Sequence, residues 1–234
     1  MFKIAYCAGH YINNPNGIPS SMGLGNIREW TLNDRVANYF AKAADEYEDV
    51  QLLRTDDPSG KNFIDIPERV AEANDWGADF YLDIHHNAAG YTFSGGGVEA
   101  YSYPESVNGK KYRNAIYECV IVAGGIKGNR ASPLQEKKFQ TLSLSKCPAV
   151  LMEYGYMDSK DDAPIIVTDE HAKLVAYATM EGIAKVAGLK KKEAVKIYAI
   201  QIGAYSSKEK AESVKNDLKK LGHVPKILEI EVQK

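Results

Sequence analysis

Residues 79–84 read Asp79-Phe80-Tyr81-Leu82-Asp83-Ile84, and His85-His86-Asn87 follow directly. A short apolar run of this length, rich in aromatic and branched residues, predicts a buried strand rather than a helix. The polar residues after it therefore lie near a strand end, which is where α/β sheets usually bind their ligands.

Two other predicted strands end in residues of the same kind. Residues 2–8 form an apolar run that is followed by His10, and residues 149–153 form one that ends in Glu153. The carboxyl ends of parallel strands lie at one edge of a sheet, so we expect His10, His85 and Glu153 to meet there. Glu29 begins a predicted helix after a loop at 11–28, and it can return to the same edge.

Strand-like and helix-like segments alternate over the first 187 residues. Further strands are predicted where apolar residues form short runs, at 50–54, 98–103 and 141–144. Helices are predicted where apolar residues recur at helical spacing, at 29–47, 66–76, 109–122 and 170–187. The alternation predicts an α/β fold, with a mostly parallel twisted sheet and helices on both of its faces.

The composition changes near residue 188. Residues 1–188 carry a net charge of −7, whereas residues 189–234 carry +5. We therefore expect a domain at 1–187, a linker at 188–195 and a strand–helix–strand unit at 196–234, whose helix spans 207–221 between strands at 196–204 and 224–230. The basic unit is suited to an anionic surface, although a merely solvated lysine-rich surface is the competing explanation.

The whole-chain composition excludes several classes of protein. The 234 residues are 44% apolar with a net charge of −2, which is typical of a globular chain and gives no reason to expect a nucleic-acid partner. No window approaches the roughly 18 apolar residues of a membrane span. Three widely spaced cysteines predict reduced thiols rather than disulfides. A strand that begins at residue 2 indicates that there is no signal peptide, so we expect synthesis in the cytoplasm.

The predicted edge cluster has the composition of a zinc site. Two imidazoles and one carboxylate suit Zn²⁺ and leave a fourth position for water. A second carboxylate outside the ligand set is then needed to carry a proton to the leaving group. We assign His10, Glu29 and His85 to one zinc ion and Glu153 to the proton transfer. Taken alone, Glu29 is also explained as an ordinary first-turn helix acid.

At these residues the chain resembles the zinc-dependent N-acetylmuramoyl-L-alanine amidases of bacterial autolysins and phage endolysins. The resemblance covers roughly residues 2–187, and the motifs that carry it occur in the family's order. They are Ala8-Gly9-His10, Glu29, Ile66-Pro67-Glu68-Arg69, Ile84-His85-His86-Asn87-Ala88, Gly97-Val98-Glu99-Ala100-Tyr101 and Pro148-Ala149-Val150-Leu151-Met152-Glu153-Tyr154-Gly155-Tyr156. Two departures occur: Asp83 stands where the family often has serine, and residues 128–144 match only loosely.

The resemblance also bears on residues around the metal. The family motif Ile-His-x-Asn-Ala selects His85 rather than His86 as a ligand, and adjacent residues of a strand point to opposite faces. His86 is therefore interpreted either as a residue at the rim of the pocket or as one that supports the metal ligands from behind. We predict that His86, Asn87 and Arg69 contact the substrate.

The C-terminal residues resemble part of a second family. The segment Tyr198-Ala199-Ile200-Gln201-Ile202-Gly203-Ala204-Tyr205-Ser206 is similar to the start of a sporulation-related repeat (SPOR) domain. Such domains bind peptidoglycan glycan strands, especially strands without stem peptides. Residues 196–234 amount to about half of one domain, so a homodimer that pairs two halves is one expectation.

Together these features predict a peptidoglycan hydrolase that cleaves the amide between N-acetylmuramic acid and L-alanine. The expected partners are peptidoglycan and, through the basic tail, anionic wall polymers. We interpret the chain as a phage endolysin that acts on the wall after release from the cell. Two alternatives stay open: a zinc peptidase that cuts within the stem peptide, and a wall-binding protein without activity.

Overall fold

The computed structural model describes residues 1–12, 28–90, 95–193, 205, 207–223 and 225–227. The described chain divides into two compact units, Met1–Lys192 and Glu193–Lys234. No helix in these described ranges is long and apolar enough to cross a membrane.

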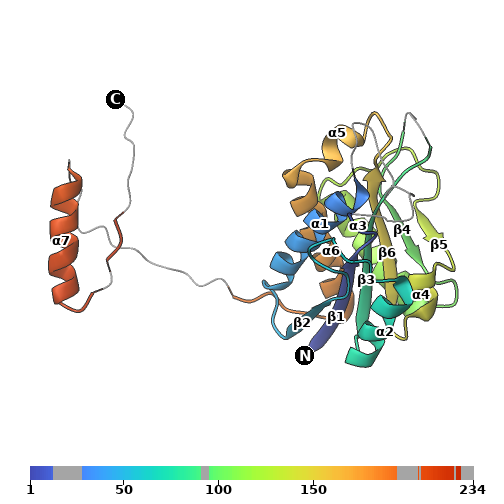
Figure 1. The fold of residues 1–234 in the computed structure, drawn as a ribbon, viewed down its shortest axis with the longest axis horizontal. Helices are drawn as coiled ribbons and strands as arrows, with labels where there is room; N and C mark the ends of the chain where they lie inside the picture. Colours follow the sequence, from blue (N-terminus) through green and yellow to red (C-terminus); the bar gives the residue numbers. More distant parts are fainter. Residues whose placement is uncertain (13–27, 91–94, 194–204, 206, 224, 228–234) are drawn as a thin grey trace. The chain divides into compact units, whose positions relative to one another are not determined.

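The first unit is built on one mixed sheet (Figure 1). Its six strands lie in the order β2-β1-β3-β6-β4-β5. All neighbouring pairs are parallel except β4 with β6, which is antiparallel. The strand bounds are β1 Phe2–Ala8, β2 Val50–Arg54, β3 Phe80–Asn87, β4 Glu99–Ser102, β5 Leu134–Glu136 and β6 Ala149–Tyr156.

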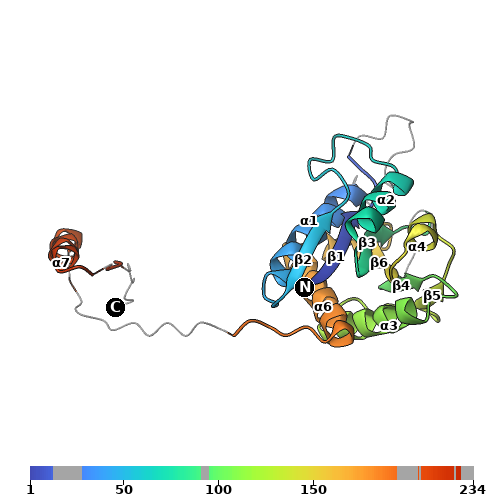
Figure 2. The same cartoon turned by 90° about the horizontal axis from the view of Figure 1, so that it is seen from below.

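Helices cover both faces of this sheet, as the apolar patterns predict. One face packs against α1 (Glu29–Ala44), α3 (Val107–Val122) and α6 (Asp169–Ala187), and the other packs against α2 (Ile66–Trp76) and α4 (Gln140–Leu144). Figure 2 shows α2 and α4 on the side of the sheet opposite α3 and α6. A short helix, α5 (Ala163–Ile166), follows β6. The predicted α/β fold is confirmed.

Alternation along β3 divides its side chains between two apolar cores. Phe80, Leu82 and Ile84 are fully buried in the core under α1, α3 and α6. Tyr81 is buried in the smaller core under α2 and α4. Because side chains alternate along a strand, Asp83 and His85 share the α2–α4 face and His86 lies on the opposite one. This division decides which residues reach the site.

Four elements differ from the sequence prediction. Residues 141–144, predicted as a strand, belong to helix α4, because their apolar residues are too few to complete a ladder and Leu142 packs instead into the core beside α2. The short strand β5 and the helix α5 were not predicted. The strand predicted at 79–84 continues to Asn87, so both histidines lie within β3 rather than after it.

The predicted linker is partly bound to the first unit. Glu48 N donates to Lys190 O, and Lys192 N donates to Glu46 O. Lys191 also forms an isolated bridge with Tyr47. The predicted linker residues up to Lys192 therefore belong to the first unit, and only those after Lys192 lie beyond it.

In the second unit the structure describes one helix, α7 (Lys208–Lys220). Ser207 caps it by accepting a hydrogen bond from Lys210 N, as the sequence predicts. None of the residues of α7 is buried. The predicted strand at 196–204 lies outside the described residues. Of the strand predicted at 224–230, only 225–227 are described, and these three residues are not in a strand.

Candidate active site

The turn after β1 holds His10 in a left-handed conformation, with φ of 64°. Such a φ is uncommon for a residue other than glycine, so neighbouring contacts must stabilise it. Arg69 of α2 supplies several of these contacts, because its guanidinium donates to the carbonyls of Ile64, Ala8 and His10 at 2.8–3.0 Å. Arg69 therefore holds the backbone of the turn.

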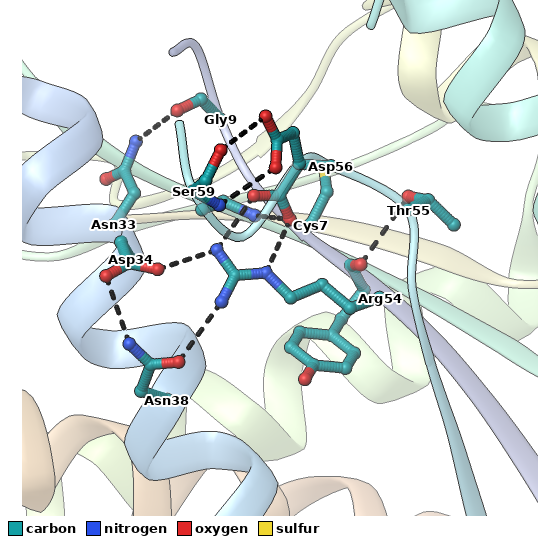
Figure 3. A network of polar contacts seen from close by, with 12 residues as sticks. Cys7, Gly9, Asn33, Asp34, Asn38, Arg54, Thr55, Asp56 and Ser59 are labelled. Carbon is teal, nitrogen blue, oxygen red and sulfur yellow. Dashed lines mark hydrogen bonds and ion pairs between the residues drawn. The ribbon is translucent and has the colours of Figure 1, made fainter. Parts of the chain in front are cut away.

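A second polar network fixes the same turn from the α1 side (Figure 3). Asp56 accepts from Ala8 N at 2.9 Å and from the guanidinium of Arg54, which also pairs with Asp34 of α1 at 2.7 Å. Asn33 donates to Gly9 O at 3.1 Å. The end of β1 is thus tied to α1, α2 and the loop after β2.

His10, Glu29 and His85 converge at this end of the sheet. Glu29, the first residue of α1, is only 3% exposed. Its Oε2 lies 3.1 Å from His10 Nε2, and its Oε1 lies 2.8 Å from His85 Nδ1. The three donor atoms lie within 4.8 Å of one another. The three predicted ligands therefore form one cluster.

The chemistry of this cluster fits a divalent cation. Zinc binds histidine nitrogen and carboxylate oxygen at about 2.0–2.2 Å in a tetrahedron, which places pairs of ligand atoms roughly 3.3 Å apart. Burial opposes the charge of Glu29, but hydrogen bonds and charge from His10 and His85 hold its pKa well below the ordinary value. The carboxylate of Glu29 is a buried anion between two imidazoles. A metal cation bound there would take the place of the protons that the imidazoles share with the carboxylate.

Glu153 lies next to this cluster, on β6. It is in register with His85 on β3, so both project from the same face of the sheet. Its Oε2 is buried without a hydrogen-bond partner among the described residues. Burial raises the pKa of Glu153 well above the ordinary value, and Glu29, Asp83 and Glu99 raise it further while His85 opposes them. A carboxyl group in this setting binds a proton more readily than an exposed glutamate does.

The three residues predicted to contact the substrate are placed differently from one another. His86 is 1% exposed on the far face of β3, where its Nδ1 lies 2.8 Å from Asn33 Oδ1, and burial lowers its pKa to about 3. Its backbone N–H donates to Glu29 Oε1 at 3.2 Å. Arg69 is committed to backbone carbonyls. Of the two positions expected for His86, the structure has the one that supports the ligands from within the core, and Arg69 holds the β1 turn.

Asn87 contacts the carboxylate of Glu99, a residue that was not predicted to belong to the site. Its Nδ2 donates at 2.9 Å to Glu99, a fully buried residue of β4 that is in register with Glu153. Glu99 also accepts from Tyr101, Tyr156, Arg130 and Gln135. The sequence could have indicated Glu99, because a single glutamate on an apolar strand needs hydrogen-bond partners or a function.

A cavity of about 380 Å³ opens beside the cluster on the α2–α4 side. His10 and His85 line it together with Phe63 and Gln140. The exposed ring of Phe63 lies 5.0 Å from the ring of Tyr11. The cluster is therefore accessible to a ligand from this side.

Comparison with known proteins gives two family matches. Residues 4–185 match the family described as N-acetylmuramoyl-L-alanine amidase, and residues 194–234 match the SPOR domain. Of the second match, the structure describes residues 205, 207–223 and 225–227.

Individual relatives agree with the first match. A sporulation-specific N-acetylmuramoyl-L-alanine amidase from Bacillus subtilis (strain 168) is 32% identical over 228 residues, which cover 95% of this chain and 82% of that protein. The endolysin of Bacillus phage SPP1 is 34% identical over 152 residues, which cover 61% of this chain and 51% of the endolysin. The catalytic domain of the amidase CwlV from Bacillus (Paenibacillus) polymyxa var. colistinus shares the fold. That match has a TM-score of 0.71 at 21% identity, and it covers 81% of this chain and all of that domain.

Proposed function

Since the chain belongs to the N-acetylmuramoyl-L-alanine amidase family, we propose that His10, Glu29 and His85 hold one zinc ion for hydrolysis of the amide between N-acetylmuramic acid and L-alanine, with Glu153 as the catalytic proton carrier. The observation that carries this proposal is the convergence of three ligand atoms within 4.8 Å, with Glu153 in register with His85 on the adjacent strand.

The roles within the site follow from the chemistry of each side chain. Zinc bound there would polarise the scissile carbonyl and make water a better nucleophile at neutral pH. Glu153 takes a proton from the attacking water and delivers it to the nitrogen of the departing L-alanine. Its buried position and raised pKa suit it to keep that proton between the two transfers. Arg69 and Asn33 keep His10 and Glu29 in place through the β1 turn.

Digestion of purified peptidoglycan, followed by mass spectrometry of the fragments, tests the reaction. We expect intact glycan strands and newly freed amino groups on the L-alanine of the stem peptide, with no products after treatment with a chelator. A zinc peptidase would instead free amino groups within the stem peptide. Products that persist after the chelator has removed all metal would contradict the zinc proposal.

Metal analysis of His85→Ala tests the ligand set. The wild-type chain should retain close to one zinc per molecule after dialysis, and the variant should retain little. Lys173→Ala, a change on the exposed side of α6, serves as the control and should retain zinc like the wild type. Full retention by His85→Ala would contradict the assignment.

The biological role that we propose is wall lysis by a phage endolysin, with release from the cell before the enzyme acts. Its support is the similarity of the catalytic region to the endolysin of Bacillus phage SPP1. A role in sporulation is the second candidate, because the alignment with the sporulation-specific amidase covers 95% of this chain. Measuring transcription of the gene during phage induction and during sporulation separates the two.

The domain arrangement that we propose is a catalytic domain at 1–187, a linker at 188–195 and a wall-binding unit at 196–234, with the linker packed on the catalytic domain as far as Lys192. The SPOR match at 194–234 supports wall binding by the last unit. Its net positive charge also favours anionic wall polymers, and salt would weaken that contribution. Pairing of two such units in a homodimer is the oligomeric form that we propose.

A further inference from the structure

A buried carboxylate lies at the ring nitrogen of His85 that does not face Glu29. Asp83, two residues earlier on β3, projects from the same face and is 3% exposed. Its Oδ1 lies 3.1 Å from His85 Nε2. The imidazole of His85 is therefore placed between two carboxylates, Glu29 at Nδ1 and Asp83 at Nε2.

The carboxylate of Asp83 is itself fixed in position. Thr141 Oγ1, on α4, donates to Oδ2 at 2.7 Å, and Cys7 Sγ, on β1, donates to Oδ1 at 3.0 Å. Both donors are buried, so water does not compete for these bonds. Asp83 thus has a single orientation, which is set by elements on two sides of β3.

The backbone of Gly9 prevents the ring of His85 from tilting away. A Cβ atom at Gly9 would lie 2.1 Å from Cε1 and 2.3 Å from Nε2 of His85. Only a glycine leaves space for the ring at this point. The ring is consequently confined between the β1 turn and the two carboxylates.

These contacts determine which nitrogen carries the proton. A neutral imidazole has one N–H, and an ionised carboxylate can only accept. When Asp83 accepts the Nε2 proton, the lone pair of Nδ1 faces Glu29 and the proposed metal position. A carboxylate on the outer nitrogen also raises the basicity of a ligating histidine.

We propose that Asp83, held by Thr141 and Cys7, is a positioning residue that keeps His85 protonated at Nε2 and thereby raises the affinity of the site for zinc. The inference rests on the proposed zinc site. Asp83 acts through His85 and is not itself a ligand, because it faces the opposite nitrogen of the ring.

Zinc affinity of the full chain provides the first test. Competition with a chromophoric chelator should show Asp83→Asn weaker than wild type by about 10- to 100-fold, the range seen when such outer partners are lost. Thr141→Val should weaken binding less. The double variant should lie within about twofold of Asp83→Asn alone, because Thr141 acts through Asp83.

A matched control separates positioning from general stability. Asp162 is also a buried carboxylate, 1% exposed, and it accepts from the backbone N–H groups of Gly97 and Tyr156 rather than from a histidine. Asp162→Asn should lower the melting temperature but leave zinc affinity within about twofold of wild type. Equal losses of affinity in Asp162→Asn and Asp83→Asn would reduce Asp83 to a structural role and overturn the proposal.

Nuclear magnetic resonance gives a readout that depends on the ring itself. In the zinc-loaded chain labelled with ¹⁵N-histidine, we expect His85 to show a proton on Nε2 and the metal on Nδ1. Zinc on Nε2, or unchanged affinity in Asp83→Asn, would overturn the inference while the zinc site itself stands. A wild-type chain that binds no zinc would remove both proposals.

Discussion

The proposed role of Glu153 depends on its being close to the ligands without being one of them. Its Oε2 is buried and has no partner among the described residues, so replacing it removes no hydrogen bond that these residues supply. We expect Glu153→Ala to keep its zinc and to lose activity by about 10²- to 10⁴-fold, the usual contribution of a general acid–base group. Metal analysis and turnover on peptidoglycan should be measured on the same preparation.

The conservative variant Glu153→Gln is the control for this change. It keeps the size of the side chain and cannot carry the proton, so its activity should fall as far as that of Glu153→Ala. Near-normal turnover of either variant would remove Glu153 from the mechanism. Loss of zinc in both would make it a ligand instead.

His171 gives a pH dependence that is separate from the metal cluster. It is 4% exposed on α6, and its Nε2 lies 3.1 Å from Tyr154 O. Burial lowers its pKa, while Tyr154 O and the charge of Asp162 oppose the shift. The folded pKa is thus below the unfolded value of about 6.5, so the unfolded chain binds this proton first as the pH falls. The contribution of neutral His171 to the free energy of unfolding is therefore complete above about pH 6.5. It is lost as the pH falls from there through the lowered pKa of the folded chain.

Denaturant unfolding at pH 7.5 and pH 5.5 measures this effect. The wild type should lose more free energy of unfolding over that interval than His171→Gln, by about 1.4 kcal/mol for each unit of pKa lowering that the interval spans. A chelator in both samples keeps metal release out of the comparison. Equal losses in the two chains would show that His171 does not titrate with unfolding.

At the residue scale, the sequence predicts those site residues whose spacing is set by strand ends. His10, His85 and Glu153 each follow or end an apolar run, and the edge of a parallel sheet brings such positions together. The inward placement of Arg69 was not predictable, because an exposed arginine and a buried one look alike in sequence. The buried position of Arg69 is evident only from the structure, in which its guanidinium donates to three backbone carbonyls.

At the element scale, the segment 140–144 shows why a short apolar pattern is ambiguous. Five residues are too few to separate period 2 from period 3.6, and packing of Leu142 beside α2 decides in favour of a helix. This difference affects the site, because Thr141 donates a hydrogen bond to Asp83 from helix α4. The longer helices, in contrast, were predicted correctly because their apolar faces repeat over several turns.

The contact between α3 and α6 makes a prediction about one glycine. A Cβ at Gly182 of α6 would lie 2.5 Å from Ile116 Cα and 2.8 Å from Ile116 N on α3. Alanine favours a helix over glycine by about 1 kcal/mol, but overpacking against backbone costs about 1–3 kcal/mol. We therefore expect Gly182→Ala to destabilise the first unit by up to about 2 kcal/mol net, as measured by denaturant unfolding.

The neighbouring exposed residue provides the comparison. Glu181→Ala changes the same turn of α6 without approaching α3, so its free energy of unfolding should stay within about 0.5 kcal/mol of wild type. A stabilised Gly182→Ala would mean that helix propensity outweighs the close approach and that α3 and α6 can separate slightly.

At the scale of the whole molecule, the two units differ in how they are stabilised. The first has two apolar cores on the two faces of its sheet. In the second, the described helix α7 buries no residue, and Leu221 directly after it is 74% exposed. A unit of about 40 residues is marginal by size alone, so it needs a partner surface. Ala211, Val214 and Leu218 recur at helical spacing along α7 and would form the apolar side of such a contact.

A second copy of the same unit is the partner that we expect, because residues 194–234 match a SPOR domain and the resemblance of this unit to about half of such a domain leaves room for a second half. Light scattering should then give a dimer for the full chain and a monomer for residues 1–192, the first compact unit. Sedimentation with purified cell wall should retain the full chain and release the shorter one. Raising the salt concentration should weaken retention only in part, because screening acts on the basic charge and not on recognition of the glycan. If both chains are monomers and sediment equally, pairing and wall targeting by the second unit are both wrong, and the catalytic unit binds the wall by itself.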